Sequence, residues 1–130
     1  MTALDCLRQA RAMLDPTTAW VQQRFGAYRN GNDADLAHAD AWSIDGAIHH
    51  AAGWTERGGH QHDALRVVQD AFHYLSEAVG GTNIAVWNDE PGRVHLDVTM
   101  ALDKAISLAE QDATSPAAVP LGALRWGPDR

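Results

Sequence analysis

Hydrophobic residues return every three or four positions in four stretches of the chain, the spacing that places them on one face of an α-helix. This pattern predicts helices over residues 2–14, 34–52, 62–79 and 93–111. A helix face of this kind is stabilised by packing against another such face. The sequence therefore predicts an all-α fold, an irregular bundle of four main helices. The third helix has the clearest face, made of Leu65, Val68, Phe72, Leu75 and Val79.

Residues that favour helix ends support these boundaries. Thr2 and Asp5 have the spacing of a capping box at the start of the first helix. Gly53 and the pair Gly80-Gly81 suit the left-handed conformation that closes the second and third helices. The hydrophobic stripe of the second helix is mostly alanine, so a neighbouring helix is able to approach it closely. This stripe consists of Ala37, Ala41, Ile44, Ile48 and Ala51.

The other segments have weaker patterns. Residues 19–28 are expected to form a short helix interrupted at Gly26, and residues 84–87 are the one stretch that suits a strand. The end of the chain is predicted not to be helical, because several prolines interrupt it. We therefore expect residues 1–111 to form a single helical domain, and residues 112–130 to form a tail that packs on the domain body or on a partner.

Composition narrows the class of protein. With 130 residues the chain can bury one hydrophobic core. Its net charge of −7 opposes binding to a phosphate backbone, so we expect no nucleic-acid partner. No apolar run approaches the roughly 20 residues of a membrane helix, and the N-terminus lacks the pattern of a signal peptide. Cys6 is the single cysteine, which fits a reducing compartment. We expect a cytoplasmic protein with no membrane partner and no cofactor.

The least ordinary stretch is AVWNDEPGR, residues 85–93. One interpretation is a turn into the fourth helix, with Asn88 or Asp89 as the helix cap. In that turn Arg93 pairs with Asp89 or Glu90, or stacks on Trp87. The other interpretation is a recognition loop, in which Trp87, Asn88, Asp89 and Arg93 bind a polar ligand or a peptide.

Histidines suggest a second candidate site. On a helix over residues 34–52, the side chains of His38, Asp45 and His49 fall on one side, and Asp45 is one turn from His49. A carboxylate that orients an imidazole is half of a catalytic or metal-binding arrangement. His73 from the neighbouring helix completes a candidate catalytic group of His38, Asp45, His49 and His73. The alternative is a structural pair beside the core.

A third candidate group lies around the connection between the second and third helices. His49, His50, His60 and His62 are expected near one end of this helical hairpin, where imidazoles are able to bind Zn²⁺, Ni²⁺ or Cu²⁺. Their spacing matches no established zinc motif, and His49 and His50 diverge on a helix. The alternatives are ordinary loop histidines and a pH-responsive surface.

Three motifs carry a resemblance. They are GAY at residues 26–28, AW followed by GAI at residues 41–48, and WNDEPGR at residues 87–93, before a helix that ends DKAISLA. Together they resemble a small bacterial and phage domain family of unknown function, over most of residues 1–110. The resemblance implies a compact helical domain with no assigned activity.

Three hypotheses about function follow. The first is a small cytosolic, non-catalytic protein-interaction or regulatory domain, whose partner is another protein or a second copy bound through a tryptophan-rich surface. The second is a hydrolase-like or metal-dependent enzyme that uses the His38, Asp45, His49 and His73 group. The third is a ligand-binding or peptide-binding module at the WNDEPGR loop. The tryptophans of that surface would be Trp20, Trp42, Trp54, Trp87 and Trp126.

Overall fold

A computed structural model of the chain describes residues 1–28, 32–34, 38–54 and 62–114. Within them the helices are α1 (Ala3–Met13), α2 (Ile44–Ala51), α3 (His62–Ala78), α4 (Ile84–Asn88) and α5 (His95–Thr114). A 3-10 helix, η1 (Thr17–Ala19), and two short strands, β1 (Gly26–Ala27) and β2 (Ala41–Trp42), complete the described elements. The predicted all-α bundle with four main helices is confirmed, with a small sheet added to it.

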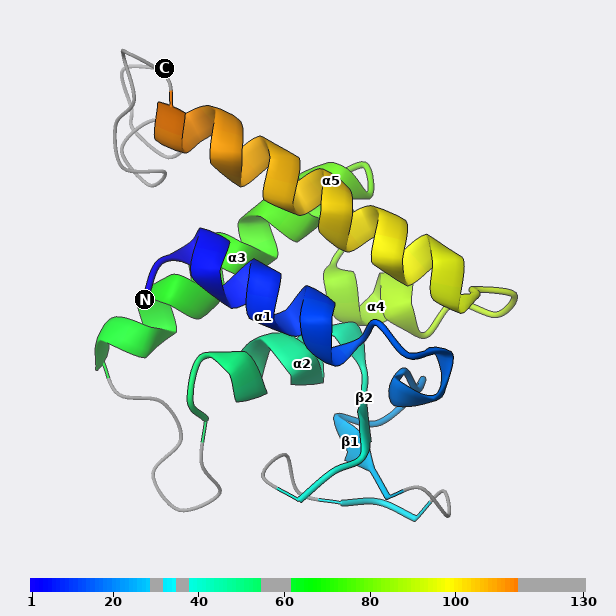
Figure 1. The fold of residues 1–130 in the computed structure, drawn as a ribbon. Helices are drawn as coiled ribbons and strands as arrows, with labels where there is room; N and C mark the ends of the chain where they lie inside the picture. Colours follow the sequence, from blue (N-terminus) through cyan, green and yellow to red (C-terminus); the bar gives the residue numbers. More distant parts are fainter. Residues whose placement is uncertain (29–31, 35–37, 55–61, 115–130) are drawn as a thin grey trace.

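Helix α1 lies at the centre of the bundle (Figure 1) and packs against α2, α3 and α5. Helix α5 crosses above α1 and α3, while α2 lies below α1. Side chains from the four longer helices meet in one core, and seven of its larger hydrophobic side chains are fully buried. These are Leu7, Leu14, Ile44, Ile48, Leu75, Val98 and Leu102. Alanines between them, such as Ala10, Ala47 and Ala105, let the helices approach closely.

The predicted signals at the ends of α1 and α3 are present. Thr2 and Asp5 form the capping box: each backbone N–H donates to the other side chain, at 3.0 and 3.1 Å. Gly80 and Gly81, with φ of +88° and +96°, close α3, and the Gly81 N–H donates to the carbonyl of Ser76 at 2.7 Å. Local sequence therefore determines both boundaries.

The predicted helix over residues 34–52 is wrong in its first half. Helix α2 begins at Ile44, because the hydroxyl of Ser43 accepts the N–H of Gly46 at 3.0 Å and caps the helix there. The two residues before Ser43 form β2, which pairs antiparallel with β1: Gly26 opposes Trp42, and Ala27 opposes Ala41. Ala41 is thus buried through a strand and not through the predicted helical stripe.

The short helix predicted over residues 19–28 is also wrong. After η1 the chain is extended at Trp20 and then enters β1. Close packing explains the glycine in that strand, since a Cβ on Gly26 would lie 2.8 Å from the Cβ of Ala39. The backbone of residue 25 also receives the N–H of Ser43, so this segment is held by the next one along the chain.

Residues 84–87 form most of α4 and not the strand that their composition suits. The side chain of Asn83 accepts the N–H groups of Ala85 and Val86, at 3.0 and 3.2 Å, and so caps α4. At the other end of the chain, α5 continues through residues 112–114, where the Tyr74 hydroxyl donates to Asp112 at 2.8 Å. The remainder of the predicted tail, residues 115–130, lies outside the described residues. Among the described helices, none has the length and hydrophobicity needed to cross a membrane.

Candidate functional site

An open groove with a volume of about 1020 Å³ lies between α2, α3 and the start of α4. Helix α2 contributes Asp45 and His49, which are one turn apart, and residues 83–85 contribute from the start of α4. The rest of the described lining belongs to one side of α3. It combines apolar and polar side chains, namely Leu65, Arg66, Gln69, Asp70, Phe72, His73 and Ser76.

Helix α3 serves both the core and the groove. Val68, Ala71 and Leu75 point into the core with at most 4% of their surface exposed. Leu65, predicted on the same buried face, is 46% exposed and lines the groove. The reason is that the N-terminal end of α3 extends beyond the core. The first residue of this helix that is buried in the core is Val68. The hydrophobic pattern correctly predicted which face of α3 packs against the core, but not where along the helix this packing begins.

The side chain of His49 lies between two phenylalanine rings. Its ring meets Phe25 edge-on at 5.6 Å and Phe72 edge-on at 5.4 Å, measured between ring centroids. His50, the next residue of α2, stacks on Trp42 at 5.7 Å. Adjacent residues on a helix point about 100° apart, so these two imidazoles face different neighbours. The ring of His49 therefore packs between Phe25, just before β1, and Phe72 of α3, which lines the groove.

The described residues do not bring the proposed metal-binding histidines together. His49 and His50 diverge, His60 lies outside the described residues, and only the backbone of His62 is described. Within the described ranges, no group of three or more His, Cys, Asp or Glu side chains is arranged to hold a metal ion.

The proposed catalytic group is assembled in part. Asp45, His49 and His73 line the same groove. His38 is an exposed residue on the loop that leads to β2 and is not among the described residues that line the groove. Its predicted place beside Asp45 depended on a helix that starts at residue 34, and α2 starts only at Ile44.

Two carboxylates of the groove are partly withdrawn from water. Burial raises the pKa of the Asp45 carboxyl, and the nearby charge of Asp89 adds to this rise. Hydrogen bonds from the Ser43 side chain and the Gly46 backbone act in the opposite direction. Burial also raises the pKa of Asp70, against the opposing effect of Arg66 and His73. The surroundings of each of these two carboxyl groups therefore disfavour its ionised form.

The WNDEPGR corner is centred on Asn88, whose side chain is fully buried. Its Oδ1 accepts the indole N–H of Trp20 at 2.7 Å and the backbone N–H of Ile44 at 2.9 Å. Its Nδ2 donates to the carbonyl of Val21 at 3.2 Å and to Asp89 Oδ1 at 3.0 Å. All four hydrogen-bonding positions of the carboxamide are thus used within the chain. Asn88 joins the loop after η1, the start of α2 and the end of α4.

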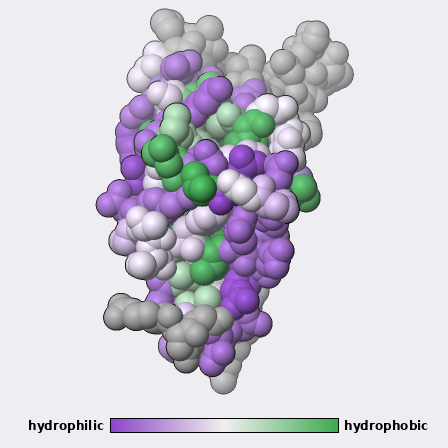
Figure 2. All heavy atoms as spheres, turned by 90° about the vertical axis from the view of Figure 1, so that its right-hand side faces the viewer, coloured by the Kyte–Doolittle hydropathy of each residue, from purple (hydrophilic) through white to green (hydrophobic). Residues whose placement is uncertain are grey.

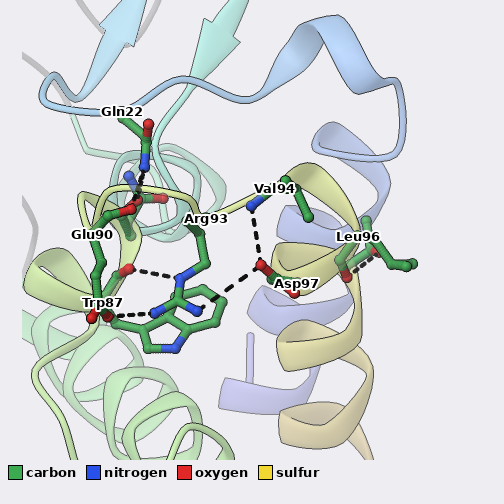
Figure 3. Close-up of polar contacts among 9 residues, drawn as sticks. Gln22, Trp87, Glu90, Arg93, Val94, Leu96 and Asp97 are labelled. Atoms are coloured by element: carbon green, nitrogen blue, oxygen red, sulfur yellow. Dashed lines mark hydrogen bonds and ion pairs between the residues drawn. The ribbon is translucent and has the colours of Figure 1, made fainter.

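Two further side chains connect the loop after η1 to the WNDEPGR corner: Asp89 from the corner and Gln22 from the loop. Asp89 Oδ1 accepts the backbone N–H of Gln23 at 2.6 Å, and Gln23 has a left-handed φ of +67°. Gln22 Nε2 donates to the carbonyls of Asn88 and Glu90, each at 3.0 Å (Figure 3). No local sequence pattern predicts these contacts, because the partners lie 66 to 68 positions apart.

Arg93 completes the corner (Figure 3). Its guanidinium carbon lies 3.9 Å from the centre of the Trp87 ring, its Nε donates to the carbonyl of Trp87 at 3.0 Å, and its Nη2 lies 2.7 Å from Glu90. The predicted stacking on Trp87 and pairing with Glu90 are confirmed. The predicted cap of the following helix is wrong: Asn88 and Asp89 turn toward the loop, and Asp97 accepts the N–H of Val94 at 3.0 Å instead.

These contacts favour the structural interpretation of the WNDEPGR corner. Asn88, Asp89 and Arg93 each direct polar atoms at other parts of the chain. Trp87 is half-buried under Arg93 and packs against the core. The corner is a joint between α4, α5 and the loop after η1.

The predicted tryptophan-rich surface does not form from the described residues. Trp20, Trp42 and Trp87 pack partly buried against the core, Trp54 is half-buried, and Trp126 lies outside the described residues. Exposed hydrophobic side chains occur instead near α4 and the start of α5. Figure 2 shows hydrophobic atoms among hydrophilic ones on the face that carries this region. The exposed hydrophobic residues of α4 and of the start of α5 include Val86, Val94, Leu96 and Met100, each more than half exposed.

The described residues form a small helical domain with an open groove between α2, α3 and the start of α4. Residues 1–108 match a family model described as a family of unknown function (DUF6197), and the chain belongs to that family. This confirms the resemblance to a family of unknown function, while the bacterial or phage origin and the three motifs stay predictions. The comparisons found no match among curated proteins and none among solved structures.

Proposed function

We propose that this protein is a non-catalytic interaction domain that binds a segment of a partner protein in the groove between α2, α3 and α4. The observation that carries the proposal is the size and lining of the groove. Its volume of about 1020 Å³ is at the upper limit of pockets for small molecules, and it is open along α3. An exposed leucine, Leu65, lies in it beside polar side chains.

The mixed lining supports a peptide ligand. Grooves that bind peptides pair apolar positions for anchoring side chains with polar groups that fix orientation. Leu65, Phe72 and Ile84 provide the apolar positions, and Arg66, Asp70 and His73 provide the polar ones. The buried single thiol of Cys6, whose pKa burial raises to about 11, fits our proposal of a cytoplasmic location.

Selection from a random peptide library displayed on phage tests the proposal. We expect enriched peptides to lose at least about tenfold in affinity for Leu65→Glu, because this change places a charge at the apolar anchor. Leu96→Glu is the matched control, since Leu96 is a 63% exposed leucine of α5 outside the described lining. If no peptide is enriched, or if enriched peptides bind both variants equally, the proposal is wrong.

A second candidate function is acid–base catalysis in the same groove. The observation in its favour is that Asp45, His49 and His73 all line it. A neutral imidazole is a general base near neutral pH, and a carboxyl with a raised pKa is a general acid. Hydrolysis assays with ester and phosphoester substrates, on the wild type and on His73→Ala, test this function. Equal turnover by both proteins would exclude a role for His73.

A further inference from the structure

We infer that residues 119–126 of the same chain cover the exposed hydrophobic face at the start of α5. This face is distinct from the groove, and the inference does not depend on what the groove binds. It consists of Val94, Leu96 and Met100, which are 54%, 63% and 60% exposed. Leu96 and Met100 are four positions apart in α5, so their side chains lie on the same side of the helix.

The row of α5 that contains Leu96 and Met100 is apolar only at its start. Further along the same row the exposed side chains are polar, namely Lys104, Ser107 and Gln111. A segment that turns back along this row from the end of α5 therefore meets polar side chains first and hydrophobic ones last. Exposed hydrophobic side chains that lie close together are typical of a contact surface.

The sequence that follows α5 has the matching order. Residues 115–118, SPAA, are small, and the larger hydrophobic side chains come after them. Pro116 and Pro120 oppose a continuation of the helix, because proline lacks the backbone N–H and disfavours the helical conformation of the residue before it. The sequence therefore favours an extended segment after α5. Its larger hydrophobic residues are Val119, Leu121, Leu124 and Trp126.

The segment is long enough to reach the hydrophobic face. The start and the end of α5 lie on opposite sides of the molecule (Figure 1). Along the helix, Met100 lies ~21 Å and Leu96 ~27 Å from Thr114. An extended chain that starts at Thr114 spans up to ~23 Å at Leu121 and up to ~33 Å at Leu124. The two leucines of the segment therefore reach the two apolar residues of α5 in the same order.

A segment of the same chain has an advantage over a separate partner. A short connection gives it an effective concentration on the order of millimolar at the face, so weak apolar contacts are sufficient to keep it bound. Charge acts in the same direction. Residues 115–130 contain Arg125 and Arg130 against Asp129, whereas the whole chain has a net charge of −7.

Paramagnetic NMR on the full chain tests the inference. A nitroxide is attached to Gly127→Cys, and the methionine methyl groups carry ¹³C. We expect the Met100 methyl signal to lose intensity and the Met1 signal to keep it, because α1 runs antiparallel to α5 and begins near its end, where Arg8 pairs with Glu110 at 2.7 Å. Cys6 is fully buried, and wild type treated with the same reagent reveals any label there.

Variants on both sides of the contact identify its cause. Leu96→Glu on α5 and Leu124→Ser in the segment should each restore the Met100 signal, since each removes an apolar partner. Leu65→Glu is the matched control, because Leu65 is an exposed leucine of α3, and here the loss of signal should persist. A Met100 signal that the nitroxide leaves unchanged, or a loss that persists in Leu96→Glu and Leu124→Ser, would overturn the inference.

A mixed sample excludes a second copy as the occupant. Nitroxide-labelled protein without ¹³C is added to ¹³C-labelled protein without the nitroxide, and the Met100 signal of the second protein should not change. A loss of this signal would assign the face to a contact between copies and overturn the inference.

Thermal unfolding gives an independent measure of the contact. Leu96→Ala and Leu124→Ala should each lower Tm by about 2 °C, and the double variant should lower it no further than either single change. Additive losses would show that the two leucines do not touch, which contradicts the inference.

Discussion

The buried carboxamide of Asn88 accepts the indole N–H of Trp20 at 2.7 Å, across 68 positions of the chain. The same oxygen accepts the first N–H of α2, that of Ile44. One side chain therefore fixes the relative positions of three segments that share no local sequence signal.

Replacing Asn88 by alanine should reduce the free energy of unfolding by about 3 kcal/mol. The substitution leaves the Ile44 N–H and the Trp20 indole N–H inside the protein without their acceptor. Urea denaturation followed by circular dichroism measures the loss. Asn83→Ala, which removes an exposed cap of α4, should reduce it by only about 1 kcal/mol. Equal losses for the two variants would show that the Asn88 network adds nothing beyond a cap.

Gly46→Ala should be among the most destabilising single-methyl substitutions in the chain. A Cβ at this position would lie 2.1 Å from the carbonyl oxygen of Phe25, so α2 and the loop before β1 would have to separate. We expect a loss of about 3 kcal/mol or more. The comparison is Gly53→Ala, where a Cβ meets open space and only the φ of +90° opposes it, for a loss of about 1 kcal/mol. A small loss of stability in Gly46→Ala would mean that this close approach is absent.

Asp45 should make stability depend on pH in the direction opposite to most carboxylates. Its folded pKa is raised, so between the unfolded value of about 3.9 and the folded value the native state holds more protons than the unfolded one. Ionisation of Asp45 therefore lowers stability as pH rises through this window. The stability of Asp45→Asn relative to wild type should be more favourable at neutral pH than near pH ~4. Denaturation curves of both proteins at the two pH values check the sign.

The capping box of α1 predicts the usual pH dependence of a carboxylate, in which stability falls as the pH is lowered. Hydrogen bonds from the backbone and side chain of Thr2 lower the pKa of Asp5. The stabilising effect of this carboxylate is present above its unfolded pKa and is lost as pH falls through the folded pKa. In Thr2→Ala the Asp5 pKa should rise toward the value of a free aspartate, since the hydroxyl is removed. An NMR titration of Asp5 measures this, and a pKa that does not move would contradict the role of the hydroxyl.

The local part of the fold was predictable from the sequence. Helices α1, α3 and α5 carry long amphipathic patterns, and the capping box at Thr2 and the glycines after α3 mark two of their ends. Arg93 found its partners within six positions, so its pairing was also predictable. In these cases the determining contacts lie within about two turns of helix.

The errors have two physical causes: pairing between distant segments outweighed the local pattern, and helix caps at Ser43 and Asn83 set boundaries that the hydrophobic pattern did not show. Ala41 fits the stripe of a helix as well as a strand, and pairing with Ala27 decides between them. The start of α2 follows from Ser43, a helix cap that the alanine pattern concealed. His38 was lost from the candidate site for the same reason, whereas Asp45 and His49, which lie on true helical spacing, reached the groove together.

Phe25 connects the two sites that the sequence treated as separate. Its backbone follows the loop that Asn88, Asp89 and Gln22 hold, and its ring borders the imidazole of His49. A residue of the groove thus packs against a turn that is not among the described residues lining it. We therefore expect a substitution in that turn to change the orientation of His49, while α2 and α3 keep their positions on either side of the groove.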